Sequence, residues 1–135
     1  MENEFLPYEL AVEMKSIGFD EPCLGYFASK DAKTIRLALW THIGYVNANR
    51  LDDDLVTAPI YQQVFRWFRE KHNLLGNVYS NASGWLWEIH DNEGGTHRFG
   101  SEWSGDCEES GMFTSFEKAE IECVKRLISI IKEKK

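Results

Sequence analysis

The sequence predicts an α+β domain in which an antiparallel sheet is packed on one face by three helices. Three observations lead to this class. Three segments repeat apolar residues at helical spacing, several short segments alternate as strands do, and the strand segments follow one another through short turns. Strands joined in this way pair antiparallel, so we expect a β-hairpin plus a three-stranded meander. The expected order is α-β-β-(β)-α-β-β-β-α, in a single globular domain over residues 1–135.

The first helix is expected over residues 7–17. Gly18 suits the left-handed position after its end, and Phe19 would then contact Met14. Its apolar stripe consists of Leu10, Ala11, Met14 and Ile17. Two strands should follow at 23–28 and 34–40, and a third short strand is optional near 45–46. Residues 47–56 indicate a polar loop.

The strongest helical pattern lies at residues 57–72, TAPIYQQVFRWFREKH. Thr57 is the expected N-cap, Pro59 suits the first turn, and Asn73 suits the left-handed position beyond the end. An apolar arc of roughly 160° contains Ile60, Tyr61, Val64, Phe65, Trp67 and Phe68. The polar side carries Gln62, Gln63, Arg66 and Arg69. Packing does not require these four residues, so they are the first candidate surface for a partner.

The meander is predicted between residues 76 and 99, with strands at 78–80, 85–90 and 96–99. In the middle strand one face carries Trp85, Trp87 and Ile89, and the other carries Leu86, Glu88 and His90. We expect Trp85 and Trp87 in the core, and the alternative is an exposed aromatic platform for sugar rings or bases.

The last helix is expected to begin at Thr114, which would form a capping box with Glu117. Its apolar face is wide enough to be covered by both a sheet and another helix. That face consists of Phe116, Ala119, Cys123, Val124, Leu127, Ile128, Ile130 and Ile131. Glu120 falls inside this arc, so it is either solvated near the helix start or paired with a cation such as Arg66 or Arg98.

Composition argues against several classes of protein. The net charge of −7 disfavours sequence-independent binding of nucleic acid. The acidic start MENEFLPYEL does not resemble a signal peptide, and no apolar run reaches the length of a membrane span. Three cysteines without metal or redox spacing suggest reduced thiols. We therefore expect a cytoplasmic protein with no membrane association and no cofactor.

Four segments together resemble a family of small uncharacterised proteins found in phages, prophages and Bacteroides-like bacteria. They are FLPYELA at 5–11, GFDEPC at 18–23, APIYQQVFRWFREK at 58–71 and FEKAEIEC at 116–123. The resemblance implies a cytoplasmic protein of a mobile element. It assigns no catalytic residue to this chain.

Candidate chemistry in the sequence is sparse. There is no phosphate-binding glycine loop and no serine nucleophile motif. His90 and His97 would face each other across the turn at 92–95 with Glu88 nearby, and such a set can bind a transition metal. Polar cross-strand pairing is the simpler interpretation of these residues. The acidic run at 52–54 lacks the spacing of a calcium loop.

Two hypotheses follow. In the first, the chain is a non-enzymatic interaction or accessory protein that binds a protein partner. Its surfaces would be the polar side of the 57–72 helix and the acidic loop at 102–109, where Trp103 is the best candidate for an exposed aromatic. In the second, the chain is a small ligand- or metal-binding domain or enzyme that uses Glu88, His90, His97 or Glu120.

Overall fold

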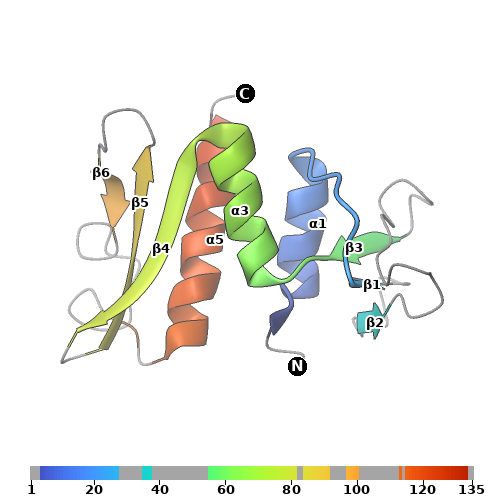
Figure 1. Cartoon of the computed structure of the whole chain (residues 1–135), viewed down its shortest axis with the longest axis horizontal. Coiled ribbons are helices and arrows are strands. Elements are labelled where there is room, and N and C mark those ends of the chain that lie inside the picture. The colour runs from blue at the N-terminus through green and yellow to red at the C-terminus, as the bar shows by residue number, and fades with distance from the viewer. Residues whose placement is uncertain are drawn as a thin grey trace. The chain divides into compact units, whose positions relative to one another are not determined.

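The computed structural model describes residues 4–27, 35–37, 55–81, 84–91, 97–100, 113 and 115–133. Within these ranges the chain is an α+β protein with three helices and two antiparallel three-stranded sheets (Figure 1). The predicted class is confirmed, although the hairpin and the meander belong to separate sheets. The chain divides into two compact units, Met1–Gln63 and Val64–Lys135. The single domain stays a prediction, and the optional strand near 45–46 lies outside the described residues.

Helix α1 (Tyr8–Ser16) ends as its sequence predicts. The N–H of Phe19 donates to the carbonyl of Met14 (3.0 Å), and that of Gly18 donates to the carbonyl of Lys15 (3.2 Å). This is the Schellman motif, and it requires the left-handed φ of 98° found at Gly18. All four residues of the predicted stripe are buried.

The sheet of the first unit has the order β2-β1-β3. Strand β1 (Gly25–Phe27) pairs with β2 (Ile35–Leu37) as the predicted hairpin, and its other edge pairs with β3 (Val56–Ala58). Strand β3 corrects the predicted start of the central helix. Thr57 is not an N-cap: it is buried in β3 opposite Tyr26.

Helix α3 (Tyr61–His72) therefore begins later than predicted. Pro59 precedes the helix instead of forming its first turn, and Ile60 makes an isolated antiparallel bridge with Phe5. The physical reason is that pairing with β1 satisfies the backbone of residues 56–58, which a helical start would leave open.

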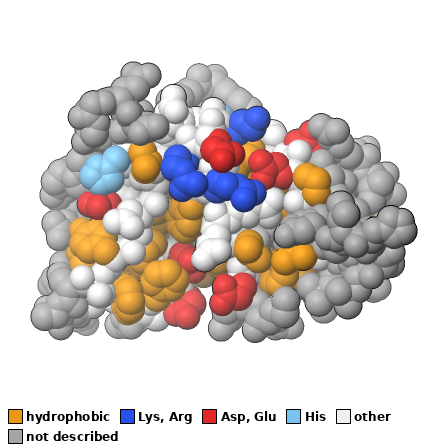
Figure 2. Space-filling view, viewed as in Figure 1, with side chains coloured by type: hydrophobic (Ala, Val, Ile, Leu, Met, Phe, Trp, Pro, Cys, Tyr) orange, Lys and Arg blue, Asp and Glu red, His pale blue; other side chains and the backbone are white. Residues whose placement is uncertain are grey.

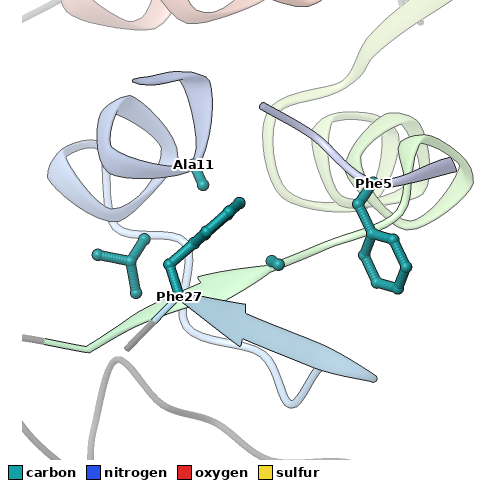
Figure 3. Close-up of a cluster of buried hydrophobic side chains, with 5 residues drawn as sticks. Phe5, Ala11 and Phe27 are labelled. Atoms are coloured by element: carbon teal, nitrogen blue, oxygen red, sulfur yellow. The ribbon is translucent and has the colours of Figure 1, made fainter. Parts of the chain in front are cut away.

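A compact apolar cluster holds the first unit together (Figure 3). Phe27 projects from β1 toward Ala11 on α1, and the ring of Tyr8 meets Phe27 edge-on, with centroids 5.2 Å apart and an interplanar angle of 86°. Helix α1 lies against β3. The buried members of the cluster are Phe5, Ala11, Phe27, Val56 and Ala58.

The sheet of the second unit has the order β4-β5-β6. Its strands are β4 (Leu74–Asn81), β5 (Gly84–Asp91) and β6 (His97–Gly100). Strand β4 starts earlier than predicted because Asn73, with φ of 55°, reverses the chain directly after α3. The left-handed backbone conformation predicted for Asn73 is thus confirmed.

The middle strand β5 also receives the chain again after β6. Phe113 bridges to Trp85, and the two residues exchange backbone hydrogen bonds of 3.0 and 2.8 Å. Gly100 lies opposite Glu88 on the same side of β5. Both ends of the segment 101–112 are therefore fixed on one strand.

Helix α5 (Phe116–Glu133) is capped by Ser115, whose Oγ accepts the N–H of Lys118 at 3.2 Å. This corrects the predicted start at Thr114, which itself lies outside the described residues. A hydroxyl one position before the first helical residue reaches the third free N–H, and Ser115 is at that position. The predicted apolar face is buried except for Phe116, which is 37% exposed.

Helix α5 covers one face of the sheet through β4 and β5. Gly76 lies on that face, because a Cβ there would be 2.8 Å from Cε1 of Phe65 on α3 and 3.0 Å from Cδ1 of Leu127 on α5. Ile89 lies opposite Gly76 and is buried. By the alternation of strands, Asn77, Glu88 and His90 project from the other face.

Candidate functional site

The exposed side of α3 is the first candidate site. Tyr61, Val64, Trp67 and Phe68 are buried, which fixes the helix rotation. Gln62, Arg66 and Arg69 are exposed at the spacing i, i+4, i+7, and we call these three residues the α3 stripe. Figure 2 shows Lys and Arg side chains gathered over α3.

The last turn of α3 adds to the basic character of this surface. Arg69, Lys71 and His72 lie in that turn, where positive charge interacts favourably with the helix dipole. The His72 ring lies 4.8 Å from the Trp67 ring, measured between centroids. Along α3, Arg66, Arg69 and Lys71 are exposed together with one carboxylate, Glu70, so positive charge predominates on the exposed side of this helix.

Gln63 does not belong to the α3 stripe, because its side chain makes hydrogen bonds within the fold, contrary to the sequence-based expectation that packing does not need it. Its Nε2 donates to Oε1 of Glu21 (3.2 Å) and to the carbonyl of Pro22 (3.0 Å). Both acceptors lie in the segment that leads into β1. Gln63 therefore positions that segment within the first unit.

Cys23 follows this segment and is an inert thiol. Its Sγ donates to the carbonyl of Glu21 at 3.4 Å, and the side chain is fully buried. Burial raises the pKa of the Cys23 thiol to about 12, although hydrogen bonds with Thr57 and Gln63 oppose the shift. Such a thiol is almost entirely protonated at neutral pH and is a poor nucleophile.

The second candidate site is a polar cluster of Asn77, Glu88 and His90 on the sheet face opposite α5. Glu88 Oε1 accepts from Nδ2 of Asn77 (3.2 Å) and lies 3.1 Å from Nε2 of His90. The Glu88 and His90 side chains are 25% and 31% exposed. The cluster is thus a partly shielded carboxylate that accepts a hydrogen bond from Asn77 and lies in contact with His90. Asn77 was not among the residues that the sequence predicts for this site.

His97 is the backbone neighbour that the sequence predicts for His90. The two residues lie opposite each other in the register, and an irregularity beside them places Arg98 as an extra residue on β6. The His97 side chain lies outside the described residues. Among the side chains that the structure describes, no group of three or more His, Cys, Asp or Glu is placed to hold a metal ion.

Of the tryptophans that the sequence offers as core residues or as an exposed binding surface, the structure places Trp85 and Trp87. Trp87 is buried, which confirms its core assignment, while Trp85 is half-buried and meets Phe116 edge-on at 5.2 Å. Trp103 and the acidic loop at 102–109 lie outside the described residues, as does the run at 52–54.

Glu120 is buried on the inner side of α5, one turn from Cys123. Burial raises the pKa of the Cys123 thiol, and the charges of Glu120 and Glu88 raise it further, while the backbone N–H of Asn77 lowers it. Cys123 therefore has the same unreactive character as Cys23.

None of the helices among the described residues is long and apolar enough to span a membrane. Comparison of the chain with protein-family models, with curated proteins and with solved structures finds no match in any of the three.

Proposed function

We propose that this protein is a non-enzymatic interaction protein whose α3 stripe binds an acidic patch on a protein partner. The observation that carries the proposal is the exposure of Arg66 and Arg69 on a helix whose opposite side is buried. Arginine is enriched at protein interfaces, and a helix anchored by its core presents its side chains with little loss of order on binding.

The chemistry of the partner follows from charge. The stripe and Lys71 offer cations, so the complementary surface carries carboxylates. Nucleic acid is the less favoured acidic ligand, because the whole chain carries −7 and repels a polyanion at long range. The resemblance to phage and prophage proteins supports a cytoplasmic setting and a host protein as the partner.

The test is charge reversal of the stripe. Arg66→Glu combined with Arg69→Glu should weaken binding of a partner, captured from host lysate and then purified, by at least about 2 kcal/mol. The matched control combines Lys118→Glu with Lys125→Glu, which makes the same charge change at exposed positions of α5. Calorimetric titration of all three proteins should show a loss in the stripe variant alone. Equal affinity of the stripe variant and the control would overturn the proposal.

A second candidate function is divalent metal binding at the Asn77–Glu88–His90 cluster. The 3.1 Å contact between Glu88 and His90, with His97 opposite His90 in the register, is the observation that favours it. Zinc titration with native mass spectrometry should show one bound ion, lost in His90→Ala and kept in His72→Gln. Absence of binding by the unmodified chain, or binding that survives His90→Ala, excludes this candidate.

A further inference from the structure

Among the described residues, strand β4 is an edge strand that lacks most of the sequence features that normally protect an edge. Among the described residues it pairs with β5 alone. It is eight residues long, LLGNVYSN, and contains no charged residue and no proline. Natural edge strands are usually short, charged, bulged or interrupted by proline, because a free edge pairs readily with another chain.

The other edge strands among the described residues show the contrast. Strands β2 and β3 have three residues each, and β6 has four residues and an irregular register. The pairing of β4 with β5 is regular over all eight positions. Of the strands that the structure describes, only β4 therefore presents a long, regularly paired backbone edge.

The hydrogen-bond pattern identifies which backbone groups of β4 face outward. Trp85 exchanges both of its backbone bonds with Phe113, so its N–H and C=O point away from β4. Ser80 lies opposite Trp85 and must be in a non-hydrogen-bonded pair. By alternation, Ser80, Val78 and Gly76 direct their N–H and C=O groups away from β5.

Only some of these outward backbone groups of β4 can be reached by another chain. Phe65 and Leu127 crowd Gly76, whereas Ser80 is exposed and Val78 is half-buried. The open part of the edge runs from Val78 to Ser80. Its two outward residues offer two donors and two acceptors to an extended backbone.

We propose that β4 pairs antiparallel with β4 of a second copy, about a two-fold axis at Tyr79. Val78 of each copy then lies opposite Ser80 of the other, and the four outward groups of each strand meet complementary groups. The uncharged sequence of β4 places no like charges at this seam. The product is a continuous six-stranded sheet with the order β6-β5-β4-β4-β5-β6.

The net charge of the chain predicts how salt affects the association of two copies. Each copy carries −7, so the copies repel at long range and salt should strengthen their association. A basic peptide on the same edge would instead be weakened by salt. A seam this short buries less than the ~1,200 Å² of stable complexes, so we expect a dissociation constant between roughly 10 µM and 1 mM.

The first experiment measures mass and amide exchange over a concentration series of the full chain. Sedimentation should show a dimer that grows with concentration and salt. The amides of Val78 and Ser80 should gain protection with the dimer, while those of Asn77 and Tyr79 are protected throughout. A monomer up to roughly 1 mM overturns the proposal. A dimer that leaves the amides of Val78 and Ser80 unprotected, or a dimer that salt weakens, also overturns it. Protection of these two amides in a monomer that has bound a peptide overturns it as well.

Substitutions supply the second experiment. Ser80→Lys should lower the association constant at least about tenfold by placing like charges at the seam. Ser129→Lys adds the same charge on α5 and should leave association unchanged. Val78→Pro removes one outward N–H from each copy without breaking the ladder to β5, and circular dichroism confirms its fold. Association that survives both changes to β4 overturns the proposal.

Discussion

Replacing Gly76 by Ala tests the packing between the β4–β5–β6 sheet and its helices. The new Cβ would lie 2.8 Å from Cε1 and 2.9 Å from Cδ1 of Phe65, and 3.0 Å from Cδ1 of Leu127. Ordinary contacts between such carbon atoms lie at about 3.5–4.0 Å. Both neighbouring side chains must therefore move for the methyl group to fit.

The expected loss of stability combines two opposing effects. Overpacking of a core costs about 1–3 kcal/mol. The φ of Gly76 lies outside the left-handed region, so alanine adopts this backbone and the lower entropy of its unfolded chain returns about 0.4–1 kcal/mol. The free energy of unfolding should therefore fall by about 1–2 kcal/mol. The melting temperature should fall by about 4 °C for each kcal/mol.

Urea unfolding of a double-mutant cycle gives the assay. Phe65→Leu removes the ring that the methyl group meets, so Gly76→Ala should cost at least about 1 kcal/mol less in that background. Ser80→Ala, an alanine at an exposed position of the same strand, is the control and should change stability by less than about 0.5 kcal/mol. A Gly76→Ala protein as stable as the unmodified chain, or a loss that Phe65→Leu leaves unchanged, would refute the reasoning.

Three further predictions concern helix ends and thiols. Gly18→Ala should lower the free energy of unfolding by about 1–2 kcal/mol through backbone strain, since no described residue other than its chain neighbours lies within 4 Å of the added methyl group. Gly18→Asn should recover part of this loss in the same urea titration. Ser115→Ala should cost about 1 kcal/mol and Ser115→Asp much less, and equal losses in thermal unfolding would contradict the assigned cap. The Cys23 and Cys123 thiols should resist labelling at pH 8 until the chain unfolds, as intact-mass measurement would show. Because the pKa values of both thiols are raised in the folded state, the free energy of unfolding should be unaffected below about pH 8.5 and should fall above it by up to about 1.4 kcal/mol per pH unit per thiol. Cys23→Ala should make this fall with pH less steep between about pH 9 and 12. An unchanged pH dependence would argue against a buried neutral thiol.

Features set by neighbouring residues could be predicted from the sequence. The end of α1 depends on Gly18 and Phe19 alone, and the reversal after α3 depends on Asn73, so both followed from local turn chemistry. The buried faces of α3 and α5 followed from helical periodicity in the same way. The short connection between Asn81 and Gly84 also fixes a register that places Asn77 opposite Glu88.

Features set by distant residues could not be predicted in this way. Strand β3 exists because Val56 pairs with Phe27, which lies far away in the sequence, and a three-residue strand has too short a pattern to reveal this. Thr57 therefore resembled a helix cap. The choice of Ser115 over Thr114 depends on where the backbone becomes helical, since both side chains offer a hydroxyl.

The attachment of both Gly100 and Phe113 to β5 has a consequence for how this protein can change over time. Their partners, Glu88 and Trp85, lie three positions apart on one strand, about 10 Å. A chain segment closed at both ends can double in length for only about 0.6 kcal/mol. Lengthening the connection between Gly100 and Phe113 should therefore cost little in closure entropy, and thermal unfolding of a chain with a glycine-serine insertion between these two attachment points would measure that cost.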